Sequence, residues 1–247
     1  MKEKVKGAML GPFTREEVTS RLGPSWVPMP RFCVTQGSSQ RAVDNGSVFG
    51  QNATVGSPWK LVLGGIDEIA SLAAVWVRSV GRDRRVRIRL ASGEVLEGWL
   101  HPAWTTKFIR SLMGRLGDMK AAYRQLAAFP GHAFAAVVAV WNEEVGSPAF
   151  FLSQALLFGE TSAVYGFNRV SRFLNVVMCL GLGPVVSGYY DDFSHLEPEE
   201  LAESGEASFK KLFDILGFDL ATEPRKDQAF SRVFEPLGAQ VDLTESG

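Results

Sequence analysis

The chain has 247 residues, of which 46% are hydrophobic and 21% are charged, and its formal net charge is −1. This composition supplies enough apolar surface for one large or two small globular domains, and it excludes collagen, coiled coils and disordered chains. The most apolar stretch, Val176 to Val186, is shorter than the roughly twenty residues of a membrane span, and no secretory signal follows Met1. We therefore expect an intracellular protein of the cytoplasm or nucleus, without a membrane partner, in which Cys33 and Cys179 are reduced, buried thiols.

The charges are distributed unevenly along the chain. Residues 1–130 carry 19 Lys and Arg against 10 Asp and Glu, whereas residues 131–247 carry 7 against 17. From Arg85 to Arg89 basic and apolar residues alternate, which is typical of a half-buried strand. Two interpretations of these arginines stay open, a solvated strand face and a surface that contacts phosphates. The acidic residues from Glu197 to Glu206 indicate a surface helix.

The first half of the chain is predicted to contain short elements. Apolar spacing and turn residues predict a helix over Thr14–Leu22, a strand over Arg31–Thr35, a helix within 62–80, a hairpin over 85–100 that turns at Ser92-Gly93, and a helix over Thr105–Leu116.

The second half is more regular. It predicts strands over Phe134–Trp141 and Phe150–Leu157, a helix over Ser162–Leu180, a strand over Pro184–Tyr190, a helix over Pro198–Leu216 that Gly217 ends, and a strand that begins within Phe218–Thr222. This order predicts an α+β fold in which helices cover one face of an antiparallel sheet.

Adjacent carboxylates provide the strongest local signal for chemistry. Asp191 and Asp192 follow a predicted strand, and like charges repel unless a cation lies between them; a solvated turn is the alternative. If the segment around Asp118 forms the neighbouring strand, Asp118 faces Asp191 across the pair. Three carboxylates suit Mg²⁺, and two such ions can clamp the attacking and leaving oxygens of a phosphoryl displacement. The three histidines lack the spacing of zinc ligands.

Five segments resemble, in order, the motifs of reverse transcriptases of the retrotransposon and retrovirus-related Pol polyprotein type. They are Arg41-Ala42-Val43-Asp44-Asn45 with Asn52 (fingers motif RPIDD), Asp118 with Tyr123 (first palm motif), Phe158 to Arg169 (FGxTNAPxxFQR), Tyr189-Tyr190-Asp191-Asp192 (YxDD box), and Leu216-Gly217-Phe218 with Lys226 (LGF…K). The resemblance spans about residues 31–240. The sequence departs from it at supporting positions, namely Ala42, Asn45 and Val164-Tyr165.

The resemblance implies the fingers and palm of a polymerase. The fingers and N-terminal region would occupy about residues 1–115 and the palm, a split βαβ or ferredoxin-like sheet, residues 116–247; the thumb, connection and RNase H domains would be absent. The implied activity is RNA-directed DNA polymerisation, which adds dNMP to a primer 3′-OH and releases pyrophosphate. The implied partners are an RNA or DNA template with its primer, dNTPs and other parts of a Pol polyprotein.

The resemblance also implies roles in catalysis. Asp118 and Asp191 would hold two Mg²⁺ ions, for which Mn²⁺ could substitute, and Asp192 would be the supporting carboxylate. Lys226 would protonate the leaving pyrophosphate; a solvated turn lysine is the alternative.

Roles in nucleotide binding are implied for five more residues. Arg41 would contact the triphosphate, for which a salt bridge to Asp44 is the alternative, and Arg31 would be a second phosphate contact. Tyr123 would exclude a 2′-hydroxyl, Phe158 would pack near the base pair, and Gly159 would let the backbone approach the nucleotide. Core packing is the alternative for both aromatic residues.

Two other functions remain open. The chain could be a catalytically silent, nucleic-acid-binding remnant of a retroelement polymerase, or another palm enzyme, such as an RNA-dependent RNA polymerase or a nucleotide cyclase. Those enzymes typically carry GDD or GGDEF boxes, so the YxDD-like box argues against them.

Overall fold

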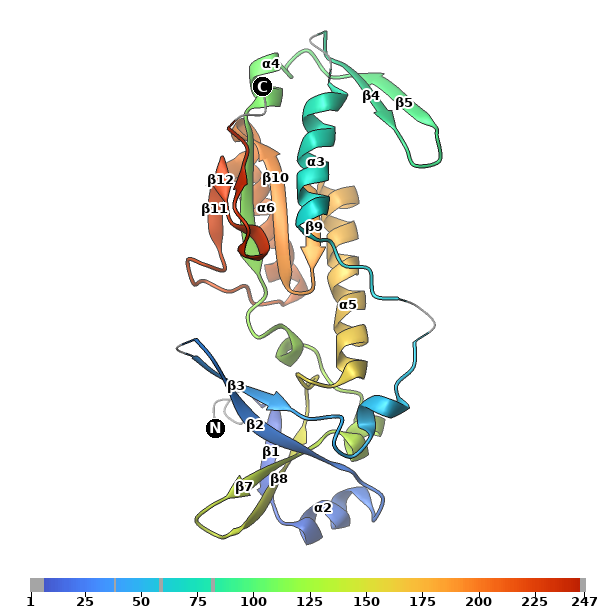
Figure 1. Cartoon of the computed structure of the whole chain (residues 1–247), viewed down its shortest axis with the longest axis vertical. Coiled ribbons are helices and arrows are strands. Elements are labelled where there is room, and N and C mark those ends of the chain that lie inside the picture. The colour runs from blue at the N-terminus through green and yellow to red at the C-terminus, as the bar shows by residue number, and fades with distance from the viewer. Residues whose placement is uncertain (1–6, 38, 58–59, 81–82, 245–247) are drawn as a thin grey trace. The chain divides into compact units, whose positions relative to one another are not determined.

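A computed structural model describes residues 7–37, 39–57, 60–80 and 83–244. The chain forms two compact units, each built from two separate segments (Figure 1). The first unit contains Met1–Leu61 and Ala121–Arg169, and the second contains Val62–Lys120 and Val170–Gly247. This division differs from the single boundary expected near residue 115, and the assignment of fingers and palm stays a prediction.

The first unit contains a five-stranded sheet in the order β1-β8-β7-β2-β3. Its strands are β1 (Met9–Phe13), β2 (Pro28–Gln36), β3 (Ser39–Asp44), β7 (Val137–Asn142) and β8 (Ser147–Ser153), and the β2–β7 pair is parallel whereas the others are antiparallel. Helix α2 (Arg15–Leu22) begins with a capping box, in which Thr14 and Glu17 each accept a backbone N–H of the other. Its fully buried Val18 packs with Val137 and Phe150 of the sheet.

The second unit contains a four-stranded antiparallel sheet in the order β11-β6-β10-β9. Its strands are β6 (Leu112–Asp118), β9 (Val185–Tyr189), β10 (Asp192–Pro198) and β11 (Gln228–Ser231), and its helices are α3 (Ile66–Ser79), α4 (Thr106–Arg110) and α6 (Ala202–Leu216). The hairpin of β4 (Arg85–Arg89) and β5 (Val95–Trp99) and the short pair β12 (Val233–Phe234) and β13 (Val241–Asp242) complete it. Helix α5 (Thr161–Val176) contributes to both units and continues as a π-helical segment, Val177–Leu182.

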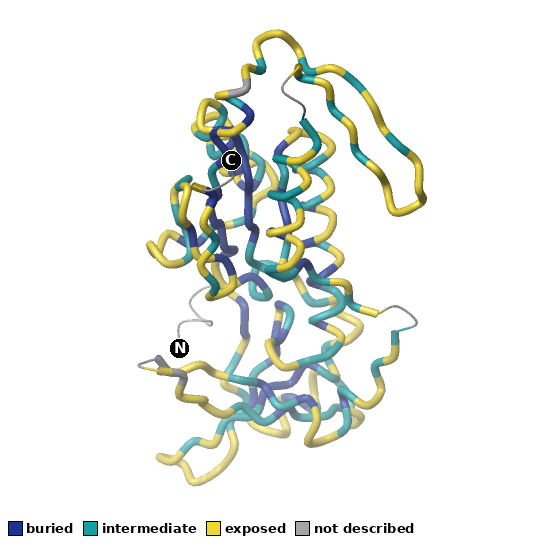
Figure 2. Tube along the Cα trace, turned by 45° about the horizontal axis from the view of Figure 1, so that its top comes forward, coloured by how far each residue is buried: buried dark blue, intermediate teal, exposed yellow. Residues whose placement is uncertain are grey.

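Both faces of this sheet are covered by helices. Leu116 and Leu196 pack with Ile69 of α3 on one face. On the other face, the Phe193 ring lies 6.1 Å from that of Phe209 in α6. The central strands β6 and β10 are buried along nearly their whole length (Figure 2), and a sheet with two apolar faces needs cover on both. The prediction of helices on one face only is therefore wrong.

Two further predictions are wrong near β6. The helix predicted over Thr105–Leu116 ends at Arg110, and β6 begins at Leu112. This strand can pass beneath aromatic rings because a Cβ at Gly114 would overlap the Phe234 ring, and one at Gly117 would lie 2.7 Å from the Phe209 ring. The strand expected within Phe218–Thr222 is reduced to one bridge, between Leu220 and Met119.

Other local predictions are confirmed or corrected residue by residue. Gly93 turns the β4–β5 hairpin with φ of 88°, and Gly217 ends α6 in the left-handed region. Cys33, on β2, is exposed rather than buried, and Glu197 lies buried on β10 rather than on a surface helix. Within the described residues, no helix has both the length and the apolar character to cross a membrane.

Candidate active site

A two-residue loop joins β9 to β10 and carries the YxDD-like segment. Tyr189 pairs with Asp192, so Tyr190 and Asp191 alone form the turn. Tyr190 has φ of 52°, a conformation that hairpin turns normally give to Gly, Asn or Asp, at a cost of about 1–2 kcal/mol for other residues. The loop is held on two sides, because the Ser171 hydroxyl donates to the Tyr190 carbonyl and the Met119 N–H donates to the Asp191 carbonyl at 3.0 Å. Strain held in place in this way is typical of functional turns.

The register of the sheet brings Asp118 beside the loop. Asp118 is the last residue of β6, and its cross-strand partner is Asp192, the first residue of β10. The expectation that Asp118 is on a neighbouring strand is confirmed, but the residue that it faces is Asp192 rather than Asp191. The two-residue turn explains the difference, because it places Asp191 at the tip of the hairpin. By strand alternation, Asp118 and Asp192 share the face of Leu116 and Leu196.

The charges of this cluster are only partly compensated. Asp118 is 6% exposed; its Oδ2 accepts a hydrogen bond from Lys226 Nζ at 2.7 Å, and its Oδ1 is buried without a hydrogen-bond partner. Burial raises the pKa of Asp192 to about 7, with further contributions from the charges of Asp118 and Asp191, against that of Lys226, and from the hydrogen bond that its protonated carboxyl makes to Asp118. Burial lowers the pKa of Lys226, but the hydrogen bond to Asp118 and the three aspartate charges outweigh it, so the pKa of Lys226 is raised.

The chemistry of these side chains suits a hard divalent cation. Carboxylate oxygens are the donors that Mg²⁺ prefers, and the orphaned Asp118 Oδ1 and the raised pKa of Asp192 both indicate missing positive charge. Across the described ranges, however, no three or more His, Cys, Asp or Glu side chains are already arranged as a metal site. The Lys226 ammonium holds the second Asp118 oxygen.

A second ion pair anchors the segment that carries Lys226. Arg115, on β6, is fully buried, and its Nη2 donates to Asp227 Oδ1 at 2.6 Å, while its guanidinium lies 4.8 Å from the centre of the Phe209 ring. Lys226 and Asp227 therefore bind β6 through two ion pairs in succession. Sequence reasoning missed this pair, although an arginine inside the otherwise apolar Leu112–Asp118 strand was a usable signal.

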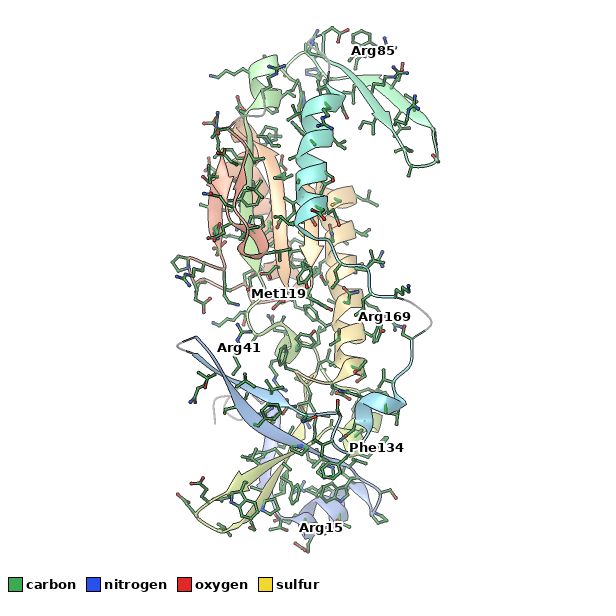
Figure 3. All side chains as sticks on the ribbon, in the orientation of Figure 1. Arg15, Arg41, Arg85, Met119, Phe134 and Arg169 are labelled. Carbon is green, nitrogen blue, oxygen red and sulfur yellow. The ribbon has the colours of Figure 1, made fainter. Side chains whose placement is uncertain are left out.

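Arg31 and Arg41 have different surroundings in the first unit. Arg31 donates to both oxygens of the buried Asp44, at 2.7 and 2.9 Å, and Arg124 donates to the same carboxylate at 3.3 Å. Arg41 lies exposed on β3, opposite Val34 (Figure 3). Asp44 is thus paired by Arg31 and Arg124 rather than by Arg41, and sequence reasoning missed Arg124.

Tyr123, Phe158 and Gly159 gather beside Asp44. The Tyr123 ring stacks on Phe167 at 4.9 Å and meets the edge of Phe158 at 5.7 Å, and Phe158 is 44% exposed. Gly159 has φ of 108°, and a Cβ there would overlap the carbonyl oxygen of Asp44. Glycine is therefore required at this position by a close approach of two backbone segments.

Comparison with known proteins gives a fold but no family. The sequence matches no protein-family model and no curated protein. Among solved structures, a foamy viral protease-reverse transcriptase in complex with double-stranded DNA is similar, with a TM-score of 0.60 and 14% identity, over 98% of this chain. The chain has a reverse transcriptase-like fold. It spans 32% of the length of the reverse transcriptase chain that it matches.

Proposed function

We propose that this chain is the fingers and palm portion of an RNA-directed DNA polymerase of the retroelement type. In this proposal the four-stranded sheet of the second unit is the palm, and Tyr189 to Asp192 is its YxDD box. The observation that carries the proposal is the pairing of Asp118 with Asp192 beside a strained two-residue turn, within a reverse transcriptase-like fold.

The second unit would perform the chemistry. Asp118 and Asp191 would hold two Mg²⁺ ions, or Mn²⁺ in their place, with Asp192 as the supporting carboxylate. When bound, the ions would stabilise charge on the attacking and leaving oxygens of an in-line displacement. Lys226 would donate a proton to the departing pyrophosphate, since its Nζ lies 2.7 Å from Asp118 Oδ2 and thus beside the proposed metal-binding carboxylates.

The first unit would bind the incoming dNTP. Arg41, which is exposed, is free to meet a triphosphate, whereas Arg31 would have to share its guanidinium with Asp44. Tyr123 would discriminate against a ribose 2′-hydroxyl by its bulk, and the exposed part of Phe158 would pack near the base pair. Gly159 would bring its backbone close to the nucleotide, while the Cβ that it lacks would meet the Asp44 carbonyl.

A silent, nucleic-acid-binding remnant is the alternative function. The chain corresponds to about a third of the matched viral chain, so most of that DNA-bound protein lies outside the likeness. Such a remnant would bind template and primer without incorporating dNMP.

Primer extension on an RNA template tests the proposal. Wild type is compared with Asp191→Asn and with the control Asp214→Asn, which changes an exposed carboxylate on α6 paired with Lys211. We expect extension in Mg²⁺ or Mn²⁺ by wild type and by the control, and a loss of about a thousandfold in Asp191→Asn, of the order found when one catalytic charge partner is removed. Circular dichroism should show the same fold for all three.

Two results would contradict the polymerase assignment. Full extension by Asp191→Asn would show that this carboxylate is not needed. Binding of primer and template by wild type without extension in either metal would favour the silent remnant.

A further inference from the structure

The outer face of the β4–β5 hairpin has no part in the function proposed above. Arg85, Arg87 and Arg89 are exposed and alternate with residues of the opposite face. The register places Trp99 opposite Arg85 and Glu97 opposite Arg87. The hairpin is exposed along most of its length, and Arg85 marks its base (Figures 2 and 3).

The inner face of the hairpin is anchored to the rest of the second unit. Val86 and Ile88, together with Leu72 and Trp76 of α3, line an apolar cavity of about 320 Å³. An isolated two-stranded hairpin is marginally stable in water, so this apolar contact determines which face turns outward. The arginine face is therefore presented to solvent by the fold.

The outer face carries excess positive charge. Glu97 pairs with both Arg85, at 2.6 Å, and Arg87, at 3.0 Å, so one carboxylate compensates two guanidinium groups. Arg89 makes no ion pair within the part of the chain that the structure describes. Guanidinium groups bind phosphates in planar, bidentate geometry, and a row of them attracts a polyanion.

Trp99 adds an aromatic platform to the same face. It is 71% exposed, and its indole meets no other ring among the described residues. An exposed indole beside arginines is the combination with which proteins stack unpaired bases while holding the backbone. Bases inside a duplex are already stacked on each other, so this platform suits a single strand.

We propose that the face formed by Arg85, Arg87, Arg89 and Trp99 binds single-stranded nucleic acid. The arginines contact phosphates and Trp99 stacks on a base, while Glu97 orients two of the arginines and limits the affinity. The assignment rests on the proposed function in one respect, because the ligand would be an unpaired part of the template. The surface is separate from the carboxylates, since Val185 at the start of β9 lines the hairpin cavity and the Tyr190-Asp191 loop lies at the other end of that strand.

Fluorescence anisotropy with labelled 20-nucleotide DNA and RNA single strands, and with the matching duplexes, tests this surface without requiring catalysis. We expect Trp99→Ala to weaken single-strand binding about tenfold, the effect of losing one stacked base. The triple variant Arg85→Ala, Arg87→Ala, Arg89→Ala should weaken it at least as much and reduce the slope of log affinity against log salt by about 2. Glu97→Gln should tighten binding about threefold, because it releases two arginines from their carboxylate.

Lys211→Ala is the matched control, since it removes one exposed cation from α6. It should leave single-strand binding within about twofold of wild type. Unchanged binding by both the Trp99 and the triple variants, a preference for duplex, or no binding by wild type would each overturn the proposal. Primer extension separates the hairpin proposal from the proposed function. If wild type extends the primer but the hairpin variants bind single strands normally, only the hairpin surface is refuted. If the hairpin variants lose binding but wild type does not extend the primer, only the polymerase is refuted.

Discussion

Asp44 in the first unit and Asp118 in the second are both buried carboxylates at the end of a strand, but their oxygens have different partners. Both oxygens of Asp44 accept hydrogen bonds from Arg31, and one also accepts from Arg124. Asp118 has Lys226 on one oxygen and no hydrogen-bond partner on the other, and it lies opposite another carboxylate, Asp192. The first arrangement is complete and structural, whereas the second is left open to a cation. Residues that resemble the motifs of one family can thus be divided into those whose charge and hydrogen-bond partners are all supplied by the fold and those whose partners are not.

The largest expected effect comes from removing Asp44, the carboxylate whose two oxygens are both paired. Asp44→Ala leaves the part-buried guanidinium groups of Arg31 and Arg124 without their shared carboxylate, and we expect a loss of about 3 kcal/mol in the free energy of unfolding. Urea denaturation measures this loss. Asp214→Ala, which removes an exposed carboxylate, should cost less than about 0.5 kcal/mol, and an equal cost for both variants would contradict the structural role of Asp44.

The next effect concerns the backbone that lies against Asp44. Gly159→Ala adds a Cβ that overlaps the Asp44 carbonyl oxygen at a φ of 108°, so we expect a loss of about 2–3 kcal/mol by thermal unfolding. Gly146→Ala is the matched control, because Gly146 has φ of 64° with nothing within 4 Å of the added atom, and it should cost only about 1 kcal/mol. If the two variants lost the same stability, the close approach at Gly159 would not be what requires glycine.

The smallest expected effect is a gain in stability, and it comes from Asp192, which lies opposite the incompletely paired Asp118. The pKa of Asp192 is raised from 3.8 to about 7 in the folded chain, so its ionisation opposes folding as the pH rises between these values. With a chelator present, Asp192→Asn should therefore be more stable than wild type above pH 7, by about 1 kcal/mol after screening of this partly exposed site.

The pH dependence supplies the control for this variant. Well below pH 3.8 Asp192 is protonated in both the folded and the unfolded chain, so the stability difference should disappear in chemical denaturation at that pH. A variant that was less stable than wild type at pH 8 would show that Asp192 is already compensated.

Part of this arrangement could be predicted from the sequence, because it depends on local pattern. The caps of α2 and α6 and the hairpin turn at Gly93 follow from residues close together in the chain. The grouping of Asp118 with the Tyr189–Asp192 segment is predicted across 71 positions, because carboxylates at neighbouring strand ends fit one cation site.

The remainder depends on contacts between distant residues. Leu112 to Leu116 fits a helical pattern equally well, and it forms a strand because the rings of Phe209 and Phe234 cover Gly117 and Gly114. The partner of Asp118 depends on the length of the β9–β10 turn, and a shift of one residue exchanges Asp191 for Asp192. Arg124 reaches Asp44 across 80 positions of sequence, which no local pattern indicates.

The most direct test of the central claim is the binding of Mn²⁺, followed by the electron paramagnetic resonance signal of the free ion. If the open oxygens of Asp118 and its neighbours form a cation site, wild type and Asp214→Asn should bind Mn²⁺ equally, and Asp118→Asn should lose most of that binding. Added Mg²⁺ should displace the bound Mn²⁺ from wild type. Equal binding of Mn²⁺ by wild type and Asp118→Asn would contradict the account.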